Sequence, residues 1–157
     1  MSELTIRSLV DPAEGELEMV GRHYQLMYEE LQVQDRRITD AGIEQWTDST
    51  KRVLDRTLFT EVAELNGEII GSIHGAIVMS PAHLGGERIA MVHHVYVLPE
   101  HRALGVAKKL AIAWIERMKE KGITAFQLHV TTGNVAGVAF WRSLGFKEEL
   151  TQFSMRS

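Results

Sequence analysis

The chain has 157 residues, of which 45% are apolar and 24% charged, and its 17 basic and 21 acidic side chains give a net charge of −4. This composition is typical of one soluble globular domain, here residues 1–157, and the absence of cysteine excludes a disulfide framework, a cysteine zinc site and a thiol nucleophile. The slight acidity argues against nucleic-acid binding, and the lack of a long apolar run or a basic leader predicts no membrane span and a cytoplasmic location.

The first third of the chain predicts one strand followed by helices. Residues 4–10 form a short apolar strand pattern, and from about residue 13 to 58 apolar side chains recur three and four residues apart. Gly42 and the polar residues around it suggest a break, so we expect two or three helices in this region. Most of the acidic excess lies here, which favours either a cationic partner or, more simply, solvated helix faces.

The middle of the chain predicts an antiparallel meander. Two apolar runs within residues 59–79 flank Asn66-Gly67, which is a two-residue hairpin signal. A second turn at Gly85-Gly86 leads into a largely apolar strand over residues 88–98. We therefore expect three consecutive antiparallel strands.

The last third predicts a helix, a strand, a helix and a final strand. The helix runs from about residue 105 to 121, the strand from 124 to 131, the second helix from 134 to 144, and the last strand begins at Phe146. No internal repeat or domain linker interrupts this order.

The segment between the strand at 88–98 and the following helix carries the pattern that points to chemistry. Gly105 and Ala107 let a ligand approach the backbone, Arg102 precedes them, and the free amides of a helix start suit an anion such as pyrophosphate. A glycine near a helix start is also an ordinary turn, so this segment alone leaves both interpretations open.

The pattern Arg102-x-x-Gly105-x-Ala107 resembles the acetyl-CoA loop of the GNAT N-acetyltransferases. A second match follows, because Asn134, the aromatic Trp141 and then Leu144-Gly145-Phe146 resemble the later element of that family. The resemblance implies an α/β (α+β mixed sheet) fold: a mostly antiparallel sheet of about six to seven strands, splayed at the cofactor site and flanked by about four helices.

The resemblance also implies the reaction. Acetyl-CoA is the co-substrate, no metal takes part, and a primary amine of a small molecule or peptide attacks the thioester directly in a ternary complex. The splayed strand binds the pantetheine arm, the loop amides hold the pyrophosphate, Asn134 contacts the pantetheine or the acceptor, and a backbone amide near Val97 stabilises the oxyanion. The residues assigned in this way to the cofactor are Val95, Tyr96, Val97, Arg102, Ala103, Leu104, Gly105, Val106, Ala107, Lys108, Asn134 and Trp141.

Such a reaction needs a group that removes a proton from the acceptor ammonium, and His129 is the candidate. It lies on the polar side of the strand at 124–131, at a position resembling the one where some relatives carry a glutamate base. The alternative is a histidine that is hydrogen-bonded within the sheet. His93 and His94 face opposite ways on the preceding strand, so one of them is placed to reach the same cleft, although a structural role is the simpler interpretation for each.

Trp141 departs from the family pattern. Many relatives carry a tyrosine there, whose phenol protonates the departing thiolate, whereas an indole N–H has no useful acidity. A packed aromatic beside the cofactor is the simplest interpretation of Trp141, and Tyr24, Tyr28, Tyr96 or water is left to supply the proton. The departure also leaves open a non-catalytic acyl-CoA-binding or regulatory domain. A nucleotide-binding domain is disfavoured because neither common phosphate-loop motif occurs.

The acceptor is the least determined part of the prediction. The helical region contains acidic residues that suit a cationic amine, although basic residues interleave with them; the acidic residues are Glu29, Glu30, Asp35, Asp40 and Glu44. Relatives are often dimers, so a homodimer is a further expectation.

Overall fold

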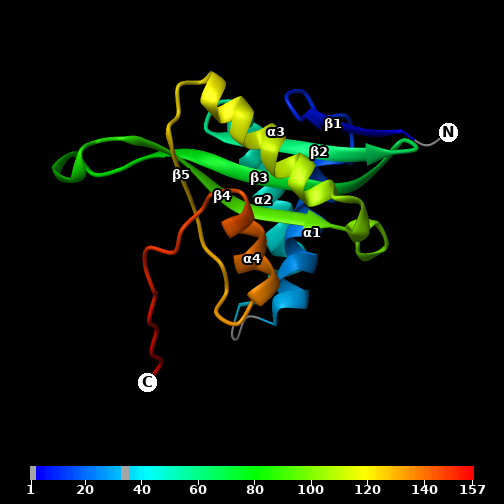
Figure 1. Ribbon diagram of the computed structural model, residues 1–157. Coiled ribbons are helices and arrows are strands. Elements are labelled where there is room, and N and C mark those ends of the chain that lie inside the picture. The colour runs from blue at the N-terminus through cyan, green and yellow to red at the C-terminus, as the bar shows by residue number, and fades with distance from the viewer. Residues whose placement is uncertain (1–2, 33–35) are drawn as a thin grey trace.

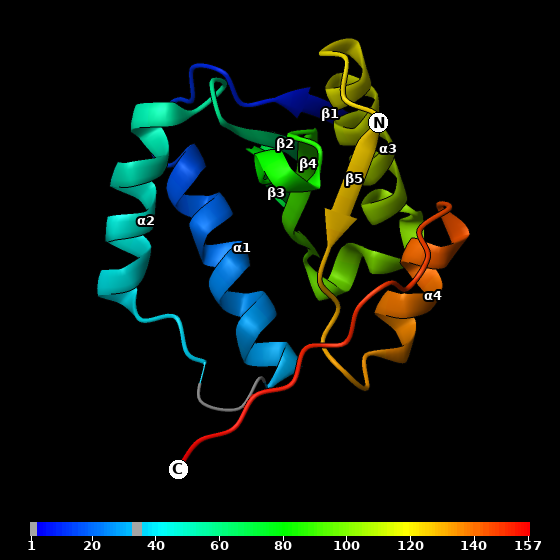
Figure 2. The same ribbon diagram turned by 90° about the vertical axis from the view of Figure 1, so that its left-hand side faces the viewer.

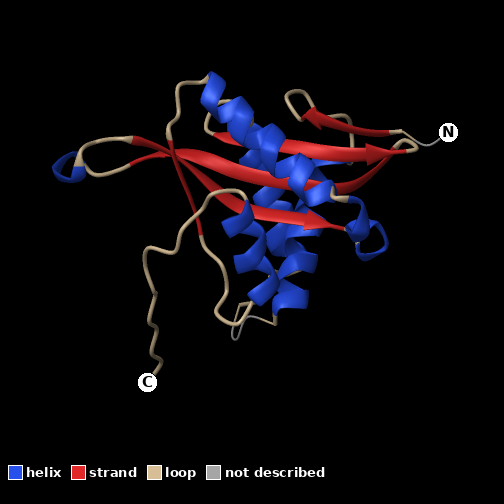
Figure 3. Ribbon diagram, viewed as in Figure 1, coloured by secondary structure: helices blue, strands red, loops and turns tan. Residues whose placement is uncertain are grey.

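In residues 3–32 and 36–157, which the computed structural model describes, five strands form one mixed sheet in the order β1-β2-β3-β4-β5 (Figures 1 and 3). Neighbouring strands are antiparallel except β4 and β5, which are parallel. The strands are β1 (Leu4–Ser8), β2 (Leu58–Leu65), β3 (Glu68–Met79), β4 (Arg88–Val97) and β5 (Ala125–Leu128).

Helices cover both faces of this sheet. Figure 2 shows α1 and α2 on one side and α3 and α4 on the other. The helices are α1 (Glu16–Leu31), α2 (Asp40–Val53), α3 (Val106–Glu120) and α4 (Val135–Ser143), with two short 3-10 helices, η1 (Ala82–Leu84) and η2 (Pro99–Leu104). None of the helices in the described ranges is long and apolar enough to cross a membrane.

The hairpin between β2 and β3 has the predicted turn. Asn66 has φ 53° and Gly67 has φ 80°, so both central residues are left-handed, as a two-residue turn that matches the strand twist requires. The expected helices at 105–121 and 134–144 and the meander of three strands are confirmed. The alternation of β5 is confirmed as well, since Phe126 and Leu128 pack against the core while Gln127 is exposed.

The core on the α3 face depends on a close approach between α3 and the sheet. Trp114 is fully buried, and its Nε1 donates to the Phe59 carbonyl oxygen at 3.0 Å. A Cβ atom at Gly75 would lie 2.6 Å from the Trp114 ring and 2.3 Å from the Met91 carbonyl oxygen. The helix can therefore reach the sheet at this point only because residue 75 has no side chain.

A partly buried charge cluster joins α3 to β2 on the same face. Arg117 donates to Glu61 Oε1 at 2.8 Å and to Asp55, and Glu61 is only 3% exposed. The hydroxyl of Ser8 donates to the same carboxylate at 2.7 Å. Because each charge has a partner of the opposite sign or a donor, the cluster is tolerated inside the fold.

Three expectations about the elements were wrong. The sheet has five strands within the described residues rather than six to seven, because no strand forms after Phe146. Phe146 packs on Trp141, but the charged residues that follow are exposed, and Glu148 pairs with Arg142 on α4 instead of extending the sheet. The two expected helices form, but the break between them precedes Gly42, which lies in the first turn of α2, where its amide donates to the Thr39 hydroxyl at 3.0 Å. The strand expected at 124–131 is confined to residues 125–128.

Candidate active site

β5 pairs with only the first part of β4. Their parallel pairing ends at Val92 and Leu128, whereas β4 continues beside β3 as far as Val97. Backbone groups alternate in direction along an antiparallel strand, and the amide of Leu98 donates to Ile70 at the β3 side. By the same alternation Val95 and Val97 direct their backbone groups away from β3, into the gap that β5 has left. This edge of β4 is suited to an extended ligand that carries amide groups.

A β-bulge marks the point of separation. His94 pairs with His74 and Val92 pairs with Gly75, so His93 is the extra residue on β4. The ring of His93 lies 5.8 Å from that of His74, and the ring of His94 lies 5.7 Å from it. Strict alternation predicted that His93 and His94 would face opposite ways; that expectation was wrong, because the bulge brings both rings beside His74.

His129 follows the last β4–β5 pair and is exposed close to the point where the two strands stop pairing. It lies just beyond β5, whose last residue, Leu128, packs with the α3 core. Partial desolvation lowers the pKa of His93, and the neighbouring His129 lowers it further. Two imidazoles from different segments thus lie close enough to interact electrostatically near the end of β4–β5 pairing.

Below the bulge lies a buried network of histidines. His23 Nδ1 is 2.9 Å from the Ser72 hydroxyl, which lies 3.4 Å from His94 Nε2, and His74 Nδ1 is 2.7 Å from the Thr60 hydroxyl. The second ring nitrogen of each of these histidines has no hydrogen-bond partner within the described part of the chain. Desolvation lowers the pKa of His23 to about 4 and of His74 to about 3, and it also lowers that of His94. All three imidazoles are therefore neutral at pH 7. The residues described include no group of three or more His, Asp or Glu side chains placed to hold a metal ion.

The loop after β4 presents free backbone amides. Gly105 is left-handed, with φ 70°, and begins α3 without a side-chain cap, so the amides of the first turn, residues 106–108, have no partner in the helix. This is the arrangement that binds phosphate groups. The Lys108 side chain is exposed beside these amides.

Arg102 is held by α1. Its Nε donates to the Val97 carbonyl oxygen at 2.8 Å, its terminal nitrogen donates to both Glu30 oxygens at 2.8 Å, and the guanidinium lies 5.2 Å from the centre of the Tyr96 ring. The Tyr96 hydroxyl also donates to Glu30, at 2.8 Å, and burial together with that carboxylate raises its pKa to about 12. The Arg102 side chain therefore fixes the loop against α1.

Asn134 and Trp141 both belong to α4. The Asn134 side chain caps the helix by accepting from the Gly137 amide at 3.0 Å, and a Cβ at Gly137 would lie 2.5 Å from Asn134 Nδ2. Asn134 lines an open pocket of about 300 Å³ at the start of the helix. Trp141 is buried and meets Phe140 and Phe146 edge-on, with ring centres 4.9 and 5.2 Å apart, so it is a packed aromatic residue.

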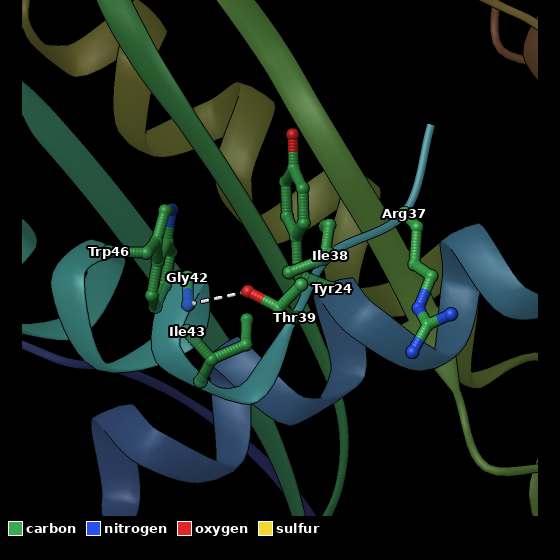
Figure 4. A pocket seen from close by; sticks show the side chains of 7 residues that line it. All are labelled: Tyr24, Arg37, Ile38, Thr39, Gly42, Ile43 and Trp46. Carbon is green, nitrogen blue, oxygen red and sulfur yellow. Dashed lines mark hydrogen bonds between the residues drawn. The ribbon is translucent and has the colours of Figure 1, made fainter. Parts of the chain in front are cut away.

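A second open pocket, of about 310 Å³, lies between α1 and the start of α2 (Figure 4). Its aromatic wall, formed by Tyr24 and Trp46, contacts the buried histidines. Tyr24 lies edge-on to His94 with ring centres 4.7 Å apart, and Trp46 lies edge-on to His74 at 5.0 Å. The pocket is thus two ring contacts away from the bulge at His93.

A family model described as the acetyltransferase (GNAT) family matches residues 19–146, which include the splayed strands, the loop and α4. The chain belongs to this family. The mycothiol acetyltransferase of Arthrobacter sp. (strain FB24) is 34% identical over 88 residues, which make up 56% of this chain and 27% of that protein. The N-acetyltransferase 8B of Rattus norvegicus is 28% identical over 102 residues, 64% of this chain and 45% of that protein. The chain therefore matches well under two thirds of the length of either relative.

Solved structures of GNAT proteins share the fold. An aminoglycoside N-acetyltransferase, AAC(6')-Iy, in complex with CoA superimposes with a TM-score of 0.78 at 19% identity, covering 100% of this chain and 96% of that one. A predicted acetyltransferase from Clostridium acetobutylicum with acetyl-CoA also gives 0.78, at 15% identity, and covers 98% and 96% of the two chains. At these identities the likeness shows the GNAT fold alone.

The acidic residues that suggested a cationic acceptor are mostly engaged within this GNAT domain. Glu30 binds Arg102 and Tyr96, and Asp40 accepts from the Gln25 side chain at 3.0 Å. Among the remaining acids, Glu29 lies 3.7 Å from Arg22, Glu44 is exposed, and Asp35 is outside the described residues.

Sequence reasoning missed the buried part of the site. His23 lies on a helical stripe, and His74 interrupts an otherwise apolar strand pattern, yet neither drew attention as part of a site. For His74 the sequence offered one signal, a polar residue within an apolar strand pattern. Its hydrogen bond to Thr60 and its contact with Trp46 are visible only in the tertiary structure.

Proposed function

We propose that the chain catalyses acetyl-CoA-dependent N-acetylation of a primary amine, on a small molecule or a peptide, by direct attack in a ternary complex. The observation that carries this proposal is the end of β4–β5 pairing at Val92 and Leu128, which leaves a free backbone edge on β4 leading to the uncapped first turn of α3. Membership of the GNAT family supports it.

The residues present fit acetyl-CoA. The backbone groups of Val95 suit the amides of the pantetheine arm, whereas the Val97 carbonyl accepts from Arg102 and leaves the Val97 amide free. The amides of residues 106–108 suit the pyrophosphate, with Ala103 and Leu104 in the preceding η2, and Asn134 Nδ2 remains available because the cap uses the oxygen. Arg102 acts by positioning the loop. When bound, acetyl-CoA supplies the thioester.

The chemical step requires a neutral amine. The amine nitrogen forms a bond to the carbonyl carbon, the Val97 amide stabilises the oxyanion, and the carbon–sulfur bond breaks to release thiolate. His129 is our proposed base, and its exposure near the end of β4–β5 pairing supports a direct or water-mediated path to the amine. His93 is a second candidate, favoured by its place in the bulge; partial desolvation and the neighbouring His129 lower its pKa.

The proton that neutralises the thiolate comes from the imidazolium, from water or from Tyr28, which stacks on Tyr24. Trp141 has no acidic proton to give. Tyr96 is bonded to Glu30, and burial raises the pKa of both Tyr96 and Tyr24 to about 12, so neither phenol is favoured as the donor.

Calorimetric titration with acetyl-CoA tests the cofactor site. Lys108→Glu places a negative charge beside the first-turn amides of α3, whereas Lys119→Glu makes the same charge change on an exposed residue in the last turn of that helix. We expect micromolar binding, about −8 kcal/mol, that weakens at least tenfold in Lys108→Glu and stays unchanged in the matched control. Equal affinities for all three proteins would remove the proposed loop site.

The base is tested by the pH dependence of thiol release with an amine that the protein accepts. If His129 is the base, His129→Ala lowers kcat most at neutral pH and removes the lower-pH limb of the profile, while His93→Gln keeps that limb. The opposite pattern assigns the base to His93. Profiles unchanged in both variants would exclude both histidines.

A non-catalytic acyl-CoA-binding domain is the alternative, and the departure at Trp141 is what favours it. Acetyl-CoA binding without thiol release over a broad panel of amines would support that alternative. The homodimer and the cytoplasmic location rest on the resemblance and the sequence alone; sedimentation equilibrium and cell fractionation test them.

A further inference from the structure

The pocket between α1 and α2 has a hydrophobic lining. Figure 4 shows Tyr24 and Trp46 bordering it with Ile38 and Ile43, and the Thr39 hydroxyl is taken up by the Gly42 amide. Its volume of about 310 Å³ is at the small end for a ligand site. The lining therefore suits one compact apolar group rather than a long polar molecule.

The charge of the lining disfavours a polycation. Among the described residues that line this pocket, Arg37 is the charged side chain, and none is a carboxylate. The nearby carboxylate of Asp40 accepts from Gln25, and that of Glu30 is held by Arg102 on the cofactor loop. A ligand with several ammonium groups would meet a like charge here without a counter-ion.

The pocket adjoins the reaction centre through its aromatic wall. Trp46 contacts His74 at 5.0 Å between ring centres, and His74 contacts His93 at 5.8 Å. Tyr24 contacts His94 in the same way at 4.7 Å. Two ring contacts, through the buried His74, thus connect the wall of the pocket to the bulge.

We propose that this pocket binds the aromatic or branched aliphatic group of a hydrophobic primary monoamine, which is the acceptor of the acetyl group. The inference rests on the proposed N-acetyltransferase function and names the acceptor class for that site. Tyr24 and Trp46 supply flat apolar surfaces, and a single ammonium group loses its proton at the histidines of the bulge.

Tryptophan fluorescence measures occupancy of the pocket directly. Trp114 and Trp141 are buried, at 0% and 8% exposure, whereas Trp46 is partly exposed on the pocket wall. We expect phenethylamine, used as the probe in the presence of CoA, to cause a saturable change in emission. The change disappears in Trp46→Phe, while calorimetry still detects binding of the probe to that variant.

Affinity and turnover complete the test. Trp46→Ala is expected to weaken phenethylamine binding and raise its KM about tenfold, whereas Gln45→Ala, on an exposed neighbour in α2, leaves both unchanged. Acetyl-CoA affinity, measured on each variant, shows that the fold and the cofactor site are intact. Spermidine serves as the cationic comparison in the thiol-release assay.

Three results would overturn the inference: no phenethylamine binding up to about 10 mM, an unchanged affinity in Trp46→Ala, or faster turnover of spermidine than of phenethylamine. None of these concerns the cofactor. Loss of the proposed function itself has a different signature, because acetyl-CoA would then fail to bind or no amine of any class would release thiol.

Discussion

Acidification to pH 5 should destabilise this domain well before its carboxylates are protonated. His23 and His74 are fully buried, and desolvation lowers their pKa values to about 4 and about 3, while an unfolded chain binds protons on histidine near pH 6.5. Between these limits the unfolded state holds more protons than the folded state. Stability is therefore complete above pH 6.5 and declines as the pH falls through this window.

The size of the loss follows from the number of protons. At pH 5, 1.5 units below the unfolded pKa, each buried histidine costs about 2 kcal/mol of unfolding free energy. His23 and His74 together account for about 4 kcal/mol, and His94, whose pKa is also lowered by burial, acts in the same direction. A domain of this size is stable by only about 5–15 kcal/mol, so the effect is a large fraction of the total. The lowered pKa values of Glu16 and Glu18, held by Arg7 and Lys51, add to the loss only at more acidic pH.

Urea unfolding followed by circular dichroism at pH 7, 6 and 5 measures this loss. The unfolding free energy should fall by several kcal/mol over this pH range. In His23→Gln its dependence on pH should correspond to about one proton fewer taken up on unfolding, whatever that variant does to stability at pH 7. Histidine NMR titration gives an independent reading of the folded-state values. A free energy that is flat between pH 7 and 5 would refute the account of these imidazoles as buried and neutral.

Two further predictions concern the α3 face. Arg117→Leu should lower the unfolding free energy by about 3 kcal/mol, because it leaves the buried carboxylate of Glu61 without its cation, and adding Glu61→Gln should recover part of the loss in chemical denaturation. Gly75→Ala should lower the unfolding free energy by about 1–3 kcal/mol, since its methyl group would overlap Trp114. Gly67→Ala is the control in thermal unfolding, because nothing lies within 4 Å of that position but its φ is positive, so it reports backbone strain without a clash. Equal losses of stability in both variants would argue against the clash.

Most of the helices and turns could be predicted because each is specified by residues close together in the sequence. Asn66-Gly67 specifies its own turn, and the apolar spacing of α3 is visible within one window of the sequence. The final strand was expected to begin at Phe146, directly after the preceding helix, but a strand also needs a neighbour with a free edge and a matching face. The exposed side chains of Leu150 and Phe153 show that no such packing occurs in this chain.

The bulge at His93 is the feature that local patterns could not predict, and the site depends on it. An extra residue on β4 shifts the register against β3 between Gly75 and His74, so that the two neighbouring histidines share one side. Parallel pairing with β5 ends at Val92, immediately before the bulge, and the β4 edge beyond it is left free. The glycine at the other side of the shift lets Trp114 approach from α3. The inserted residue thus lies where the β4 edge loses its partner, and it brings His93, the second candidate for the proposed base, beside His74.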